Sequence, residues 1–470
     1  MPESATQPDP TALDLESLAA DVVALAVKAG ASDAEAVARE GDEFSVNVRM
    51  GQVETLKESG SRGLGLRAFL GLRSASASTS DLTAEGIRQL VEGALALAKI
   101  TEEDPFAGLP EAKEFGSVDT RMTGDDLHLY YEDVYSLSGA ERIEWARRAE
   151  AAALDADPRI VNSDGGSFDA ATGRKVLANS RGFVGGYRSS YAGVSVVPLA
   201  MDANGQMQRD YWWSSARRLA DLESPESIGR EAARRTLRRL GARRVPTQRV
   251  PIVFAPEAAQ SLIGSVFEAA SGDAIWRGAS FLAGRMGEPI AAPNMTIVDD
   301  NTMLLPTGAG GFGSSPFDGE GLPSLRTVVV ENGVLRNYLL NTYTARKLRM
   351  KSTHNASRGL AGTPGIGCGN LYLQPGSFTE TQIIGDVPAG LYVTSLMGSG
   401  VNLVTGDYSR GATGLWIENG QLTYAVEEVT IAGNLAEMLM NVTAIGNDLV
   451  FRGAVASPTL RIDGMTIAGS

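Results

Sequence analysis

The stretch "TGLWIENGQLTYAVEEVTIAG" (413–433) contains the pattern that decides the fold of the second half of the chain: an apolar run, then Glu-Asn-Gly, then another apolar run. Because Asn and Gly tolerate the left-handed backbone of tight turns, this stretch predicts a β-hairpin. The stretch "RTVVVENGVLRNYLL" (326–340) repeats the design. Two similar hairpins without a fixed period between them predict a curled or barrel-like sheet rather than a solenoid.

The first half of the chain mixes helical and strand patterns. Two-residue alternation with Gly turns runs through 43–79, and strands are again expected over 160–213. Apolar residues at helical spacing predict four helices, at about 13–29, 83–100, 138–155 and 225–240. A proline interrupts the polar segment "RVPTQR" (244–249). The fold class is therefore α+β, with a mixed N-terminal domain (1–244) and a β-rich C-terminal domain (245–470).

Composition limits the classes of partner. The formal net charge of −14 disfavours nucleic acid or an anionic membrane as a direct partner, because phosphate binding needs clustered Lys and Arg. The single cysteine, Cys368, excludes an internal disulfide framework and fits a reducing compartment. No apolar run approaches the ~20 residues that span a bilayer, and "MPESATQPDP" has no signal-peptide pattern. We expect a cytoplasmic protein.

The stretch "PEAAQSLIGSVFEAASGDA" (256–274) predicts a helix with a core-facing stripe, beginning at Pro256 and ending before Gly272. A Gly-rich and acidic segment follows, of the kind that often carries chemistry. The chain has only two histidines, His128 and His354, which leaves little material for a histidine metal site or a Ser-His-Asp triad.

Several acidic residues are candidates for a carboxylate pair or a site for a hard cation. They are Asp299 and Asp300, Asp318 and Glu320, and Glu427 and Glu428. The alternative is that they are solvated groups at strand ends and in loops. The Gly-rich segment 308–313 matches a dinucleotide-binding spacing, but no helix can open in the "SSPFDGEGLP" that follows, so a loop is expected.

Two polar segments are candidates for binding a peptide end. His354, in "KSTHNASRG", suits a peptide end or an anion, and the alternative is a surface hydrogen-bonder. Tyr343 and Arg346, in "TYTARKL", combine an aromatic ring with a cation, which suits a peptide carboxylate or an interface. The alternative there is an ordinary amphipathic turn.

Several long stretches resemble the TldD/PmbA family, also called modulators of DNA gyrase. These stretches are "GASDAEA" (30–36), "DPFAGLP" (104–110), "GRMGEPIAAPNMTIVDD" (284–300), "DGEGLPSLRTVVVENGVLRNYLLNTYTARKL" (318–348), "GSGVNLVTGDYSRGATGLWIENGQLTYAVEEVTIAGNLAEML" (398–439) and "AIGNDL" (444–449). The resemblance extends over nearly the whole chain. It implies a two-domain subunit acting in proteolysis of unfolded peptides and in peptide maturation.

The family resemblance also implies which kind of subunit this is. TldD-type chains are metallopeptidases with His-Glu-x-x-x-His on a helix, and PmbA chains, also called TldE, lack that motif and assemble with them. In register with "GRMGE", the first, second and last motif positions hold Ile263, Gly264 and Glu268. The C-terminal segment has no cysteine to add a ligand. The chain thus resembles the PmbA type, with no catalytic residue and no cofactor of its own.

The leading hypothesis is a metal-free subunit, inactive alone, that completes a TldD/TldE-type peptidase. Its expected partners are a TldD-type zinc peptidase chain and an unfolded or extended peptide, with a homodimer as the other assembly. The candidate interface residues are Tyr343, Arg346, Tyr408 and Trp416, although internal packing is an equal alternative for Trp416. Two other functions stay open: a stand-alone regulatory or peptide-binding protein, and an enzyme that uses a carboxylate-bound cation.

Overall fold

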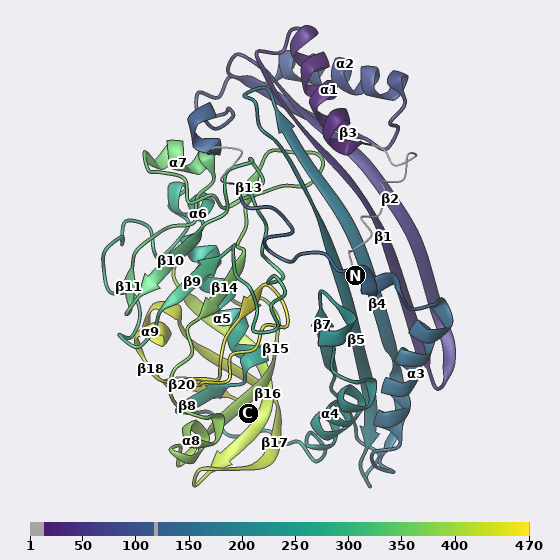
Figure 1. Cartoon of the computed structure of the whole chain (residues 1–470). Coiled ribbons are helices and arrows are strands. Elements are labelled where there is room, and N and C mark those ends of the chain that lie inside the picture. Colours follow the sequence, from purple (N-terminus) through teal and green to yellow (C-terminus); the bar gives the residue numbers. More distant parts are fainter. Residues whose placement is uncertain (1–13, 117–120, 470) are drawn as a thin grey trace.

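The computed structural model describes residues 14–116 and 121–469, which form two halves lying side by side (Figure 1). The first half is built on one long antiparallel sheet with strand order β3-β2-β1-β4-β5-β6, and β7 pairs with β5. Its strands are β1 (Asp33–Arg49), β2 (Gln52–Leu70), β3 (Arg73–Thr79), β4 (Ile160–Asn179), β5 (Val184–Met201), β6 (Met207–Arg209) and β7 (Trp212–Ala216). The strands expected over 43–79 and 160–213 are confirmed.

Four helices pack on one face of this sheet (Figure 1), and each starts at a side chain that caps its free N–H groups. They are α1 (Leu15–Lys28) capped by Asp14, α2 (Ala84–Ile100) by Thr83, α3 (Gly139–Leu154) by Ser138, and α4 (Pro225–Leu237) by Ser224. Helices α1 and α2 cover one end of the sheet, and α3 and α4 cover the other, each pair over its own apolar cluster. All four predicted helices are confirmed, with α4 ending three residues earlier than expected.

The second half contains a closed barrel. Strands β17 (Gln421–Asn434), β16 (Asp407–Glu418), β15 (Ala389–Met397), β8 (Gln248–Phe254) and β20 (Leu460–Ala468) pair in that order, and β17 also pairs with β20. That last pairing closes the sheet, and β18 (Val442–Ile445) adds to β20. The predicted hairpin is β16–β17, with Asn419 and Gly420 at φ 51° and 76°. The expected barrel-like sheet is confirmed.

A second sheet of order β11-β10-β9-β14-β19 lies beside the barrel. Its strands are β9 (Ile297–Asp300), β10 (Arg326–Glu331), β11 (Val334–Leu335), β14 (Asn370–Leu373) and β19 (Val455–Ala456). The other predicted hairpin is β10–β11, which turns at Asn332 and Gly333. Shorter elements complete this half: α6 (Gly272–Trp276), α7 (Thr342–Leu348), β12 (Ala356–Ser357), β13 (Gly365–Ile366), α8 (Glu380–Gly385) and α9 (Leu435–Met440).

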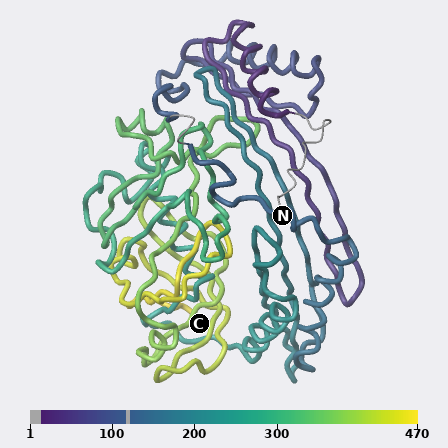
Figure 2. Tube along the Cα trace, in the orientation of Figure 1, coloured from purple at the N-terminus to yellow at the C-terminus, as the bar shows by residue number. Residues whose placement is uncertain are grey.

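The face of the long sheet that is free of helices looks toward the second half. An apolar cluster joins the two halves there, made of Val37, Phe115, Leu177, Phe183, Phe317 and Leu322. Along the chain, the segment before residue 117 leaves the sheet and lies against the second half (Figure 2), where Phe106, Gly108 and Leu109 accept hydrogen bonds from Arg346. No helix of the described residues is both long and apolar enough to cross a bilayer.

Candidate functional site

Helix α5 (Pro256–Ala270) holds the positions where the family resemblance places a metal motif. It packs between the barrel, touching β8 and β15, and the second sheet, touching β14 and β19. The side chain of Ile263 is fully buried in the apolar core of this half. Glu268 is exposed, and a Cβ added at Gly264 would meet no atom within 4 Å. One motif position therefore points into the core, while the other two lie on the open face of the helix.

The residues at these positions do not fit a zinc ion. A zinc site needs three or four N, S or O ligands, and a catalytic one also needs a carboxylate to activate water. Ile263 and Gly264 have no donor atom in their side chains, and Glu268 alone provides a single carboxylate. Over residues 14–116 and 121–469, no three His, Cys, Asp or Glu side chains gather in a way that would hold a metal.

The acidic candidates separate into two groups. Asp299 accepts hydrogen bonds from Asn355 Nδ2 and the Gly369 N–H, at 2.6 and 2.7 Å, and Asp318 accepts from three backbone N–H groups. These carboxylates brace the loops around residues 354–358. Glu427 and Glu428 lie elsewhere, bonded to Gln208 and Arg244. The structure thus does not bring the three acidic pairs together at a cation site.

Burial raises the pKa values of the acidic groups at the junction of the halves. The pKa of Asp299 rises to about 6 and that of Asp318 to about 6, in each case mainly through loss of water. The pKa of Glu320 rises to about 7, because burial and the neighbouring Asp318 both oppose its charge.

The two polar segments with peptide-end candidates lie at the junction between the halves. His354 Nδ1 is 2.6 Å from the carbonyl oxygen of Pro323, so its ring is held by the chain itself. Arg346, on α7, donates to three carbonyl oxygens of the segment 106–109. Tyr343, also on α7, lines a cavity of about 390 Å³ together with Arg67 and Glu320. Whether any of these residues contacts a peptide or another chain stays a prediction.

Tyr408 and Trp416 lie in strand β16 and face the core of the barrel half. Their exposed fractions are 2% and 6%, and both belong to its apolar cluster. Neither side chain is on the surface of this chain, so the structure favours the packing alternative for Trp416 and places Tyr408 in the same role. Burial on this scale results from closure of the barrel, which local sequence does not show.

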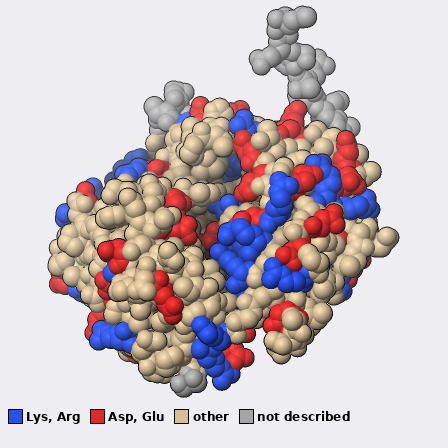
Figure 3. Space-filling view, turned by 90° about the horizontal axis from the view of Figure 1, so that it is seen from below, with Lys and Arg blue, Asp and Glu red and all other residues tan. Residues whose placement is uncertain are grey.

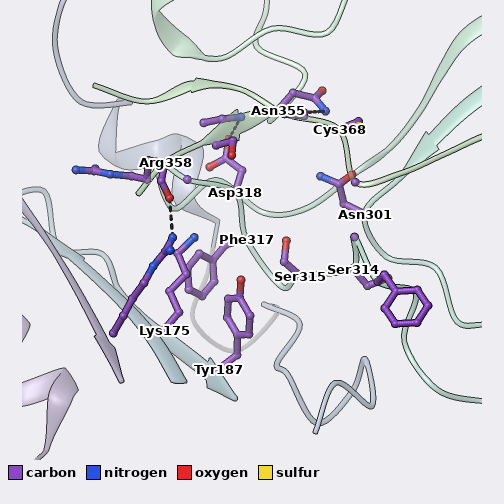
Figure 4. A pocket seen from close by; sticks show the side chains of 18 residues that line it. Lys175, Tyr187, Asn301, Ser314, Ser315, Phe317, Asp318, Asn355, Arg358 and Cys368 are labelled. Carbon is purple, nitrogen blue, oxygen red and sulfur yellow. Dashed lines mark hydrogen bonds between the residues drawn. The ribbon is translucent and has the colours of Figure 1, made fainter. Parts of the chain in front are cut away.

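A polar cavity of about 210 Å³ lies where the long sheet meets the loops of the second half (Figure 4). The sheet contributes Arg39 from β1, Lys175 from β4 and Tyr187 from β5. Loops of the second half contribute most of the opposite wall, including Asn301, Ser314, Ser315, Asp318, Asn355, Arg358 and Cys368. Figure 4 shows the Tyr187 and Ser315 hydroxyls pointing into this space.

Sequence reasoning missed the basic side of this cavity. Arg39 and Lys175 are 136 positions apart and belong to no local motif. A usable signal was present for Lys175, a cation within the strands predicted over 160–213, whereas Arg39 lies before the strand stretch predicted from residue 43. The sequence predicts Asp318 and Glu320 as a carboxylate pair or a cation site, whereas Asp318 lines this cavity and Glu320 lines the cavity of about 390 Å³.

The cavity continues into a larger hollow over the helix-free face of the sheet. Two adjoining spaces of about 510 and 670 Å³ share Glu40, Gly41, Thr172 and Arg174 in their linings. Viewed from below, Figure 3 shows a hollow between the halves with positively charged side chains along it.

Comparison with known proteins gives consistent matches along the chain. Residues 34–98, 132–240 and 247–469 match PmbA/TldA metallopeptidase domain 1, central domain and C-terminal domain. The Metalloprotease PmbA of Escherichia coli O157:H7 is 38% identical over 447 residues, covering 95% of this chain and 94% of that protein. The Metalloprotease PmbA homolog of Haemophilus influenzae is 36% identical, covering 97% and 96%.

Solved structures agree with the fold. A protein from Bacteroides thetaiotaomicron, named as a modulator of DNA gyrase, superposes with a TM-score of 0.88 at 26% identity, covering 97% of this chain and 100% of its own. TldE from Thermococcus kodakarensis shares the fold, with a TM-score of 0.82 at 21% identity over 96% and 99% of the two chains. The fold and helix α5 define a metallopeptidase-like protein of two joined halves. The chain belongs to the PmbA/TldD family.

Proposed function

We propose that this chain is the metal-free subunit of a TldD/TldE-type metallopeptidase that acts in proteolysis of unfolded peptides and in peptide maturation. The observation that carries the proposal is helix α5, where the core-buried Ile263 and the bare Gly264 occupy the positions of a ligand and a base. A subunit built this way needs a TldD-type chain to supply zinc and the catalytic carboxylate.

Strand β2 supports a role in contacting extended chains. Its residues 52–63 pair with β1 on one side, while β3 pairs only with 64–70, so the outer side of 52–63 faces no other described strand. Free N–H and C=O groups along such an edge are a template for an added strand. Val53 and Leu56 on this stretch are 43% and 50% exposed.

The test compares the isolated chain with a mixture containing a TldD-type chain from the same host. We expect the isolated chain to contain no stoichiometric zinc by elemental analysis and to leave an unfolded peptide uncut. The mixture should co-elute as one complex and cleave the peptide faster than the TldD-type chain alone, with activity lost on chelation. Stoichiometric zinc together with chelator-sensitive cleavage by the isolated chain would contradict the proposal.

A further inference from the structure

Two cations enter the polar cavity between the halves without a carboxylate partner. Arg39 donates from Nη2 to the carbonyl oxygen of Arg358 at 2.6 Å, and its buried Nε has no hydrogen-bond partner. The amine of Lys175, on the neighbouring strand, makes no hydrogen bond or ion pair with any side chain or carbonyl that the structure describes. Both side chains line the same 210 Å³ space. Charges withdrawn from water are normally paired, so these two half-buried cations favour the binding of an anion.

The charges on the lining favour an anionic ligand. Arg358 also lines the cavity, and its guanidinium pairs at 2.8 Å with Glu35, a carboxylate that also pairs with Arg67 at 3.1 Å. Asp318 is the carboxylate on the wall, and its oxygens already accept three backbone N–H bonds. Arg39, Lys175 and Arg358 line the cavity against the single carboxylate of Asp318, so the lining carries an excess of positive charge. Burial lowers the pKa of Lys175 to about 8, so its amine is still largely protonated at neutral pH.

The neutral groups on the wall favour a ligand that also carries an amide. The hydroxyls of Tyr187 and Ser315 point into the space (Figure 4) and are donors for a carboxylate. Asn301, which is 7% exposed, lines the cavity, and its buried Oδ1 has no hydrogen-bond partner among the described residues. An amide side chain of this kind complements a backbone N–H. At ~30 Å³ per water molecule, the volume equals about seven waters, enough for one amino-acid residue.

We propose that this cavity binds the carboxylate of an acylated amino acid, with Arg39 and Lys175 holding the carboxylate and Asn301 the adjoining N–H. Two sources have this chemistry, the C-terminal residue of a peptide and a free N-acylated amino acid. The site lies wholly within this chain, so it is independent of the proposed subunit role and needs no peptidase activity to test.

Calorimetric titration of the full chain at pH 7 provides the test. The probes are acetyl-Ala-Ala with a free C-terminus, the same dipeptide as its C-terminal amide, N-acetylalanine and inorganic phosphate. We expect the free acid to bind about tenfold or more tightly than the amide and than phosphate. N-acetylalanine binding as tightly as the dipeptide acid assigns the site to free N-acylated amino acids, and tighter binding of the dipeptide assigns it to peptide C-termini.

Single substitutions of the cavity residues test whether the acid binds in this cavity. Lys175→Met should weaken binding of the acid about tenfold or more, while thermal stability is kept, since it removes a half-buried charge that has no ion-pair partner. Lys175→Arg should retain most of the affinity, and Lys28→Met, at the exposed end of α1, should change nothing. Arg39→Gln provides a second test of the same carboxylate contact. Equal binding of acid and amide, tighter binding of phosphate, no binding of the acid, or full affinity in Lys175→Met would overturn the proposal.

Discussion

Glu320 is the residue where burial has its clearest energetic consequence. Its carboxyl is 4% exposed and accepts a hydrogen bond from the Thr342 N–H at 2.9 Å, while Asp318 lies close by. Its pKa of about 7 stands above the ordinary 4.5, so between these values the folded chain holds a proton that the unfolded chain releases. The stability that this group contributes is therefore present at low pH and falls as pH rises through 7.

The first prediction is that Glu320→Gln stabilises the protein at alkaline pH. Gln resembles the protonated acid and keeps an oxygen for Thr342, so the variant avoids burying a charge. At pH 8 we expect it to be more stable than the parent by on the order of 1–3 kcal/mol, and at pH 5 nearly equal. Urea unfolding at both pH values measures this. Glu331→Gln, at an exposed site, is the control, and a variant less stable than the parent at pH 8 would refute the argument.

At the scale of the element, helix α5 combines good helical signals with two positions, Ile263 and Gly264, whose side chains have no donor atom for a metal. Its two buried stripes fill the space between the barrel and the second sheet. Gly264 lowers the stability of this helix, because a glycine inside a helix is less stable than an alanine. The space that a Cβ would occupy at this position is empty.

The second prediction is that Gly264→Ala stabilises the chain by about 0.5–1 kcal/mol, measured by chemical denaturation. Gly229→Ala in α4 is the matched control, because its Cβ would lie 2.3 Å from the Ala149 carbonyl oxygen. That control should lose stability. Equal effects of the two substitutions would show that local packing does not decide the outcome.

The third prediction concerns rebuilding the motif with Ile263→His, Gly264→Glu and Glu268→His. Residues five apart on a regular helix diverge by ~140°, and position 263 faces the core, so the two imidazoles cannot meet one metal. We expect weak zinc binding in a chelator competition, and a loss of about 2–4 kcal/mol from the buried His in a urea titration. Ile263→Val, expected to lose about 1 kcal/mol, is the control. Tight binding of about one zinc per chain would contradict the geometry.

At the scale of the whole molecule, arginines join the two halves. Arg358 reaches Glu35 across the junction, and Arg217 donates to the carbonyl oxygens of Gly310 and Gly311. Arg346 holds the segment 106–109 through three carbonyl oxygens, while Lys347 lies over the ring of Phe106. The contacts of Arg358 and Arg217 hold loops at the wall of the cavity that we propose binds a carboxylate, and the contacts of Arg346 hold the junction near the 390 Å³ cavity.

The fourth prediction is that Arg346→Ala loosens this junction. Losing its charge-assisted bonds should cost about 2–4 kcal/mol of stability and speed limited proteolysis near residues 104–110. Arg346→Lys should restore only part of the loss, because a single ammonium group cannot reach all three carbonyl oxygens as the planar guanidinium does. Lys351→Ala, exposed nearby, is the control. Unchanged stability and cleavage in Arg346→Ala would mean that the apolar cluster alone holds the halves together.

Local sequence determined the elements of this protein. Asn-Gly turns specify the hairpins at 419–420 and 332–333, and capping residues and apolar spacing specify the helices, because these signals act within a few residues. The family likeness and the loss of ligands at Ile263 and Gly264 are also visible in the printed sequence. The division into domains at 244 and 245, the absence of a cofactor and the partner remain predictions.

Only the tertiary structure decided how these elements meet. Pairing of β17 with β20 closes the barrel and turns Tyr408 and Trp416 inward, which alternation along one strand cannot specify because either face could be the inner one. The cavity joins Arg39 and Lys175 on neighbouring strands to loops more than a hundred residues further along the chain. Such contacts depend on long-range packing, whereas the periodicity of a sequence reports only on each segment's own buried face.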